Sequence, residues 1–136
     1  MELEWRREQL PTWSEDKKRI IGARPEIFPT LAAADEGAVM PGDWWRVERG
    51  DQIVGYGWMD VTWGDAEVLL AVDPSHRGQG IGSFILERLA GEAHRQGLRY
   101  LYNVIPEQHP APEGLQRWLE ERGFGLSGDG LLKRQS

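Results

Sequence analysis

The 136-residue sequence contains no cysteine, which excludes disulfides, thiolate nucleophiles and thiolate metal ligands. It has no uninterrupted run of roughly 18 apolar residues, the length that a membrane-spanning helix needs. Its first ten residues, MELEWRREQL, lack the apolar core of a secretory signal. From these absences we expect a cytoplasmic protein with no membrane partner and no metal cofactor.

Basic residues are also scarce, since 16 Lys and Arg stand against 22 Asp and Glu and give a formal net charge of −6. No basic cluster suggests binding to nucleic acid. An acidic surface mildly favours a cationic small molecule or a basic peptide as partner. Length and composition fit one globular domain over residues 1–136. The sequence leaves open whether the chain forms a homodimer.

The first half of the sequence predicts strands around one irregular segment. A first strand is expected before Pro11, and Ser14 is a good N-cap for a helix. The segment up to residue 43 is rich in proline, with one short helix expected near residues 30–38. Three runs of β-branched and aromatic residues follow, broken at RGD and WGD. They predict an antiparallel meander at roughly 44–48, 52–62 and 66–72.

The second half predicts a helix, a strand, a second helix and a hairpin. Apolar residues recur with helical period from Gly80 to Gln96, and Gly97 supplies the stop. The next apolar run, residues 98–105, lies at a distance from the meander that fits a crossover, so the two strands would be parallel. A loop at 106–114, a helix at 115–123 and a terminal hairpin complete the chain. This order indicates an α/β (α+β) fold with a mixed sheet.

The stretch VDPSHRGQGIG, residues 72–82, has the composition of a phosphate-binding turn. A nucleotide P-loop would need Gly-Lys-Ser/Thr, and no lysine follows Gly82. A dinucleotide fold would need a third glycine that is missing after Gly80 and Gly82. What remains is Arg-x-x-Gly-x-Gly, beginning at Arg77, at the start of a predicted helix. Free backbone N–H groups and the helix dipole favour an anion there.

The longer string LLAVDPSHRGQGIGSFILERL resembles the acetyl-coenzyme A signature of the GNAT superfamily of N-acetyltransferases. The resemblance continues to RWLEERGF and covers roughly residues 67–124. It implies a single-domain GNAT fold: a mixed, mostly antiparallel sheet, helices on both faces, and a central parallel strand pair that splays around the cofactor. It also implies acetyl-coenzyme A as the acetyl donor.

The same resemblance assigns roles in cofactor binding. The main chain of Leu70, Ala71 and Val72 would pair with the pantetheine arm, and Gln108 falls where the family often has an asparagine that touches the cofactor. The residues expected to hold the pyrophosphate are those of the turn: Arg77, Gly78, Gln79, Gly80, Ile81, Gly82 and Ser83.

Acetylation of an amine requires a base, because the amine is cationic at neutral pH. The resemblance implies Glu67, which begins the strand leading into the signature, with a water relay as the alternative. Some family members have an acid where this chain has Asn103, and the family's tyrosine acid falls on Leu119, which cannot donate a proton. The lack of cysteine excludes a cysteinyl acyl-enzyme and favours direct attack in a ternary complex.

Four of the seven tryptophans lie in residues 44–63 and suggest either core packing or an aromatic wall of the acceptor site. Beside Asp60 and Asp65, such a wall would suit a cationic amine. Two functions stay open at this point. The first is an N-acetyltransferase acting on a primary amine of a small molecule, amino acid or peptide. The second is a GNAT-fold module that binds acetyl-coenzyme A as a sensor or regulatory partner and catalyses little.

Overall fold

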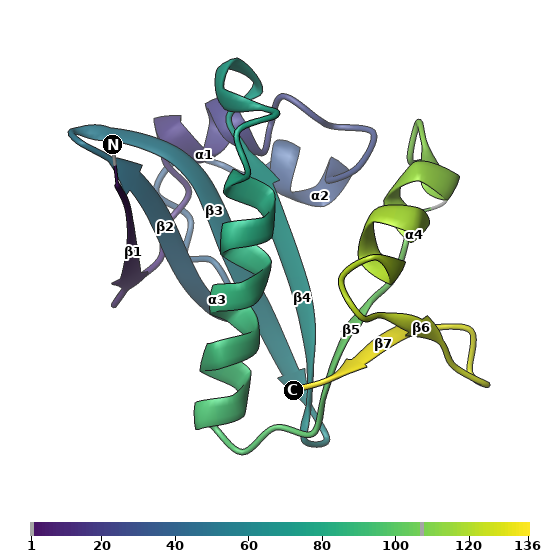
Figure 1. Ribbon diagram of the computed structural model, residues 1–136. Helices are drawn as coiled ribbons and strands as arrows, with labels where there is room; N and C mark the ends of the chain where they lie inside the picture. Colours follow the sequence, from purple (N-terminus) through teal and green to yellow (C-terminus); the bar gives the residue numbers. More distant parts are fainter. Residues whose placement is uncertain (1, 107) are drawn as a thin grey trace.

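One mixed sheet organises the protein, whose computed structural model describes residues 2–106 and 108–136. The elements in chain order are β1 (Leu3–Glu8), α1 (Glu15–Ile20), α2 (Pro29–Ala32), β2 (Asp43–Arg49), β3 (Gln52–Thr62), β4 (Asp65–Val72), a 3-10 turn (Pro74–His76), α3 (Ile81–Arg95), β5 (Tyr100–Asn103), α4 (Pro112–Glu120), β6 (Gly125–Leu126) and β7 (Leu132–Gln135). Figure 1 shows their arrangement, and the α/β class expected from the sequence is confirmed.

The seven strands follow the order β1-β2-β3-β4-β5-β7-β6. Every neighbouring pair is antiparallel except β4 and β5, which are parallel as the crossover predicted. Their pairing covers only three residue pairs, from Asp65↔Tyr100 to Glu67↔Tyr102. Beyond this point the strands separate toward the top of Figure 1. The sheet therefore opens in its middle.

Two predicted boundaries in the second half of the chain were wrong by a few residues. β5 is shorter than the expected run 98–105, because the chain leaves the sheet after Asn103. α4 starts at Pro112 rather than residue 115, since proline suits the first turn of a helix, where no intrahelical donor is needed. The loop before α4 is correspondingly shorter than predicted.

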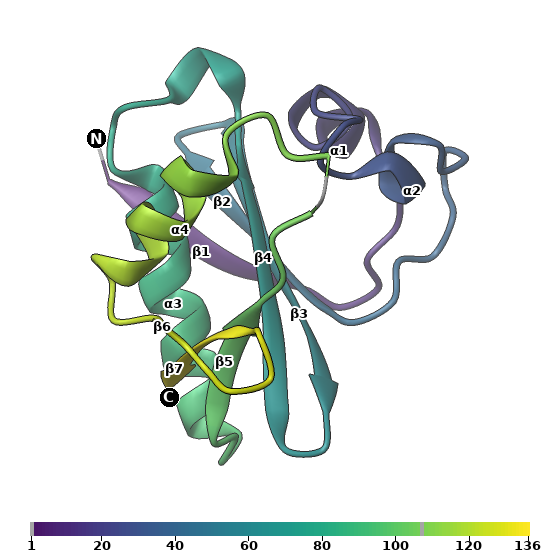
Figure 2. The ribbon, with the colours of Figure 1, turned by 90° about the vertical axis from the view of Figure 1, so that its right-hand side faces the viewer.

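Helices cover both faces of the sheet, as Figure 2 shows. The core on one side is built from α3 with the apolar face of α4, and the core on the other side from α1 and the segment up to α2. α3 approaches β3 very closely, because a Cβ on Gly57 would lie 2.6 Å from Cγ2 of Ile85. The glycine thus sets the height of α3, and with it the position of the helix N-terminus.

Adjacent tryptophans of β2 divide between the two cores. Trp44 stacks on Trp58 at 4.5 Å between ring centroids on the α1 side, whereas Trp45 stacks on Trp5 at 5.6 Å on the α3 side. Each of the pair Trp44 and Trp58 is at most 3% exposed. The core interpretation of these tryptophans is confirmed. Trp63, in contrast, is 90% exposed at the tip of the β3–β4 hairpin.

The break at WGD forms the expected hairpin turn, with two residues between the paired Thr62 and Asp65. Trp63 and Gly64 have φ angles of 54° and 84°, the left-handed pair of a type I′ turn. Trp63 is the non-glycine residue with positive φ in the described part of the chain. Its side chain has no packing partner to offset this backbone conformation.

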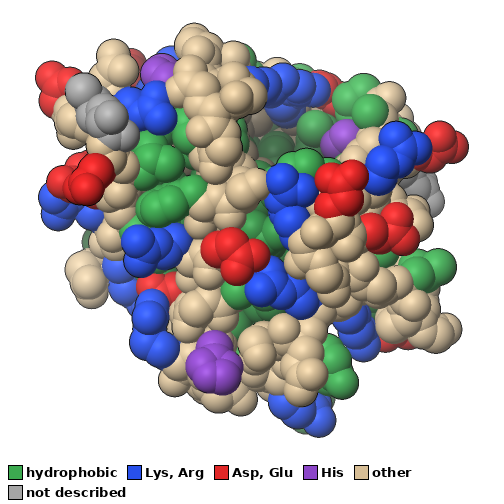
Figure 3. Space-filling model, in the orientation of Figure 1, with side chains coloured by type: hydrophobic (Ala, Val, Ile, Leu, Met, Phe, Trp, Pro, Cys, Tyr) green, Lys and Arg blue, Asp and Glu red, His purple; other side chains and the backbone are tan. Residues whose placement is uncertain are grey.

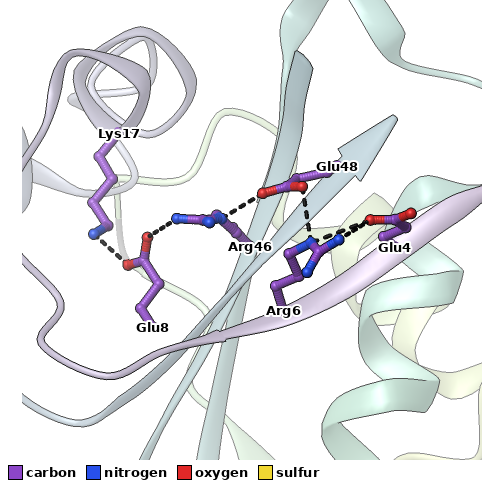
Figure 4. Close-up of polar contacts among 6 residues, drawn as sticks. All are labelled: Glu4, Arg6, Glu8, Lys17, Arg46 and Glu48. Carbon is purple, nitrogen blue, oxygen red and sulfur yellow. Dashed lines mark hydrogen bonds and ion pairs between the residues drawn. The ribbon is translucent and has the colours of Figure 1, made fainter. Parts of the chain in front are cut away.

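A chain of alternating charges ties α1 to the edge of the sheet (Figure 4). Lys17, only 1% exposed, lies 2.6 Å from Glu8 and donates to the Thr12 carbonyl at 2.6 Å. The pairs then run outward along β1 and β2 in the order Lys17–Glu8–Arg46–Glu48–Arg6–Glu4. Because Lys17 is buried, this ion-pair chain fixes α1 where solvent cannot compete.

Candidate active site

A cavity of about 680 Å³ occupies the opening between β4 and β5. The segment from α1 to α2 forms one wall, α4 and the loop before it form the opposite wall, and the N-terminus of α3 closes one end. Hydrophobic side chains are visible deep between α3 and α4 in Figure 3, with Lys and Arg side chains beside them. Its volume is typical of a site that holds a small organic ligand.

The predicted glycine turn forms the end of this cavity. Gly78 and Gly80 have φ angles of 76° and 80°, and no atom lies within 4 Å of a Cβ built on either. Gly80 is the N-cap of α3, so the N–H groups of Ile81, Gly82 and Ser83 have no partner within the helix. The glycines therefore serve the backbone conformation and leave the turn open for a ligand.

Asp73 fixes the start of the turn. Its carboxylate accepts the Ser75 N–H at 2.9 Å and pairs with Arg19 of α1. Burial alone would raise the pKa of Asp73, but the Ser75 N–H and the Arg19 guanidinium outweigh burial and lower it. Since the carboxylate stays charged, it holds the turn and α1 together across the working pH range.

The free edge of β4 faces the cavity. On the cavity side of β4, Nδ2 of Asn103 donates to the Val68 carbonyl at 2.8 Å. On the β3 side, the Asp73 N–H donates to the Val54 carbonyl of β3, also at 2.8 Å. Because main-chain groups of successive residues point to opposite neighbours, those of Leu70 and Val72 face the opening as Val68 does. Among the described strands, none pairs with Leu70 and Val72 on the side that faces the cavity.

Ala71 therefore differs from its two neighbours. By the same alternation its N–H and C=O point to β3, where Ala71 lies opposite Tyr56. Its side chain, 8% exposed, lines the cavity instead.

Asn103 marks the point where the strands separate. Its amide occupies the Val68 carbonyl, while its Oδ1 is buried without a hydrogen-bond partner among the described residues. Asn103 itself lines the cavity. A buried unpaired carbonyl oxygen is unfavourable, so this atom is available to accept a hydrogen bond from a ligand.

The cavity wall is cationic although the whole chain is acidic. Its described lining contains no Asp or Glu, and the charged or titratable side chains in it are Arg24, His76, Arg77, His109 and Arg122. The acidic residues lie elsewhere on the surface, Asp60 and Asp65 among them. The cationic acceptor suggested by those two aspartates thus gains no support from their position.

Arg122 is a residue that the sequence interpretation missed. Its Nε and Nη2 donate to Oγ of Ser83 at 3.0 and 2.8 Å, and its guanidinium lies 4.0 Å from the ring centroid of Trp118. It places a positive charge beside the first turn of α3, and Arg77 of the glycine turn lines the same cavity. The i, i+4 spacing of Trp118 and Arg122 was the available signal.

Three predicted residues do not line the cavity. Gln79 turns its Oε1 toward Arg49 of β2, which donates to it, and Gln108 is exposed. Glu67 lies in β4 opposite Asp60 of β3 and Tyr102 of β5. Burial, followed by the nearby charge of Asp60, raises the pKa of Glu67.

Glu67 nevertheless lies beside the cavity. It shares a sheet face with Leu69 and Ala71, which do line it. Two residues along a strand span about 7 Å, so Glu67 lies about this far along β4 from Leu69.

Leu119 lines the cavity at the position where the family resemblance places a tyrosine acid, and its side chain has no proton to donate. His109 lies in the wall just before α4, where its Nδ1 accepts the Ala111 N–H at 2.9 Å. With Nδ1 accepting, a neutral ring carries its proton on Nε2. His109 thus brings an Nε2–H hydrogen-bond donor to the cavity wall.

A parallel strand pair that opens beside a glycine turn defines the class: an α/β protein with a cavity between the two separated strands. A family model described as "Acetyltransferase (GNAT) domain" matches residues 41–124. The chain therefore belongs to the GNAT acetyltransferase family, and the resemblance seen in the sequence is confirmed. No curated protein matches the chain.

Solved structures of similar fold were found with coenzyme A bound. YhhK from E. coli, bound to coenzyme A, is 14% identical with a TM-score of 0.70, over 100% of both chains. PaiA N-acetyltransferase from Thermoplasma acidophilum, in complex with coenzyme A, is 12% identical with a TM-score of 0.58, over 68% of this chain and 60% of that protein. Rv2747 from Mycobacterium tuberculosis, in complex with coenzyme A and NLQ, is 28% identical with a TM-score of 0.52, over 62% and 49%.

At the low sequence identities of YhhK and PaiA, the similarity shows a shared fold alone. This chain spans less than two thirds of the length of PaiA and of Rv2747. In the part of the chain that the structure describes, no helix is long and apolar enough to cross a membrane.

Proposed function

We propose that the protein is an acetyl-coenzyme A-dependent N-acetyltransferase that acts by direct attack of a primary amine in a ternary complex. One observation carries this proposal: the anion-binding turn, the free edge of β4 and an apolar wall on the α1 side all border the same cavity. The acceptor would be a small molecule, an amino acid or a peptide.

The cofactor would lie along β4. The N–H groups of the turn, residues 78–83, and the charge of Arg77 suit the pyrophosphate. The pantetheine amides would pair with the main chain of Leu70 and Val72 as if they were another strand. The acetyl group would then reach the point where Asn103 closes the opening.

The chemistry needs one proton removed and one returned. The amine nitrogen forms a bond to the thioester carbonyl carbon and the C–S bond breaks, while the amine proton passes through water to Glu67. The raised pKa of Glu67 brings this base closer to neutrality, where it accepts a proton more readily. The leaving thiolate accepts a hydrogen bond from the Nε2–H of His109 and takes its proton from water, in place of the missing tyrosine.

Membership of an acetyltransferase family favours this enzyme over the weakly catalytic sensor that the sequence left open. The two are separated by turnover, since both would bind acetyl-coenzyme A.

Calorimetry with acetyl-coenzyme A tests the cofactor site first. We expect saturable binding that Gly80→Trp abolishes, because the indole would fill the open turn. Release of free thiol across a panel of amines then tests catalysis. Absence of binding would refute both the enzyme and the sensor.

The base is tested with Glu67→Gln. We expect a loss of kcat and loss of the acidic limb of the pH profile, with acetyl-coenzyme A affinity unchanged. Glu120→Gln, an exposed residue outside the cavity wall, is the matched control. An unchanged pH profile in Glu67→Gln would exclude Glu67 as the base.

A further inference from the structure

Trp44 and Trp58 do not line the described cavity and offer a cationic acceptor no free aromatic face. Trp44 and Trp58 stack on each other nearly parallel, with 2° between their planes. The Lys17 ammonium lies 5.0 Å from the Trp44 ring centroid and makes a cation–π contact with this ring. The cation–π contact of Trp44 is thus already made within the protein, and Trp58 packs against Trp44 and Phe28.

The charges around the cavity also oppose a cationic acceptor. Its described lining carries arginine and histidine side chains and no carboxylate. Arg77 belongs to the glycine turn and Arg122 to the segment after α4, and both lie near the N-terminus of α3. The phosphates of the cofactor would pair with these two charges. Arg24 is the arginine that remains.

Arg24 lies in the opposite wall, in the segment between α1 and α2. Among the described residues, Arg24 forms an ion pair with Glu26, two positions along the chain, with 3.5 Å between Nη1 and Oε1. Both side chains are about one-third exposed or more, at 32% and 40%, so solvent weakens this pair. The guanidinium is therefore available to a carboxylate, which it can bind with two parallel N–H···O bonds.

The surface beside Arg24 is apolar. Ile20, Ile27 and Phe28 line the same wall, and Phe28 packs against the buried Trp58 at 5.4 Å. An acceptor that presents a carboxylate to Arg24 would lay its next group on these three side chains.

We propose that the acceptor is an α-amino acid with an apolar side chain, whose carboxylate binds Arg24. This inference rests on the proposed acetyl transfer. The side chain lies on Ile20, Ile27 and Phe28, and the α-amine points to the thioester at the end of the cavity. Arg24 is then a specificity-determining residue that contacts the acceptor and not the cofactor.

The experiment compares acceptors that differ only in the carboxylate. Steady-state transfer is measured with leucine and leucinamide and with phenylalanine and phenylalaninamide. A hydrogen bond to a charged group contributes about 1.5–3 kcal/mol, roughly ten- to hundredfold. We expect the wild type to prefer the amino acid over its amide by such a factor in kcat/KM.

Arg24→Gln should abolish this preference by raising the KM for leucine roughly ten- to hundredfold, with kcat and the Kd of acetyl-coenzyme A little changed. Arg24→Lys should restore part of it. Lys18→Gln removes the same charge from an exposed position of the neighbouring α1 and should leave all three constants unchanged.

Several results would overturn the inference alone. They are equal transfer to leucine and leucinamide, no transfer to any apolar amino acid by protein that binds acetyl-coenzyme A, or an Arg24→Gln variant that weakens acetyl-coenzyme A instead of the acceptor. Failure of the wild type to bind acetyl-coenzyme A would overturn the proposed function and, with it, this inference.

Discussion

Replacing Gly80 by alanine isolates the backbone contribution to cofactor binding. The residue has φ = 80°, and a Cβ placed there meets no atom within 4 Å, so the substitution adds strain without a clash. The left-handed conformation costs about 1–2 kcal/mol for an L-residue with a side chain. The turn is exposed, so we expect it to relax in the free protein rather than lower the stability of the fold.

Binding must then restore the strained geometry, because the N–H groups of α3 point at the pyrophosphate only in that conformation. The expected result is a Kd for acetyl-coenzyme A about 5- to 30-fold higher by calorimetry, with a nearly unchanged melting temperature. Wild-type affinity in Gly80→Ala would refute the reasoning that the turn conformation holds the phosphate.

Gly91→Ala is the matched control for this measurement. It makes the same chemical change inside α3, where a Cβ also meets nothing within 4 Å and φ is not positive. Alanine in a helix interior is better than glycine by about 0.5–1 kcal/mol. We expect a higher melting temperature and an unchanged Kd, the reverse of Gly80→Ala.

Three further predictions concern stability. The pKa of Glu67 is raised in the folded state, so the neutral carboxyl favours folding below its ordinary pKa of 4.5, and this contribution is lost as pH rises. Glu67→Gln should therefore have a higher melting temperature than wild type at pH 7. A difference between variant and wild type that is the same at pH 7 and at pH 4 would contradict this. Lys17→Met should lower the free energy of unfolding in urea by about 3 kcal/mol, because it leaves Glu8 without its buried partner, and adding Glu8→Gln should recover part of the loss; purely additive effects would exclude the coupling. Trp63→Asn should stabilise by about 1 kcal/mol, because asparagine tolerates the left-handed turn position and the indole is exposed; no gain would mean that Trp63 makes contacts in solution.

The sequence predicted the meander and α3 well because their signals are local. Alternating burial, two-residue turns such as WGD and the helical period after Gly80 each depend on neighbours within a few positions. The turn itself was found the same way, since arginine and glycine occur at fixed spacing in eleven residues.

The side chains that complete the site could not be found from local pattern. Asn103 reaches the Val68 carbonyl across 35 positions, and Arg122 reaches Ser83 across 39. The first contact arises where the sheet opens, and the second where the segment after α4 meets the N-terminus of α3. The cationic wall was hidden as well, because a net charge of −6 is a sum over the chain and does not say which side chains face inward.

Asp73 belongs to both halves of the site at once. One carboxylate secures the glycine turn through the Ser75 N–H and grips α1 through Arg19. The helix it grips leads directly into the wall that carries Arg24. The position of the turn and the position of this wall are therefore coupled through one side chain.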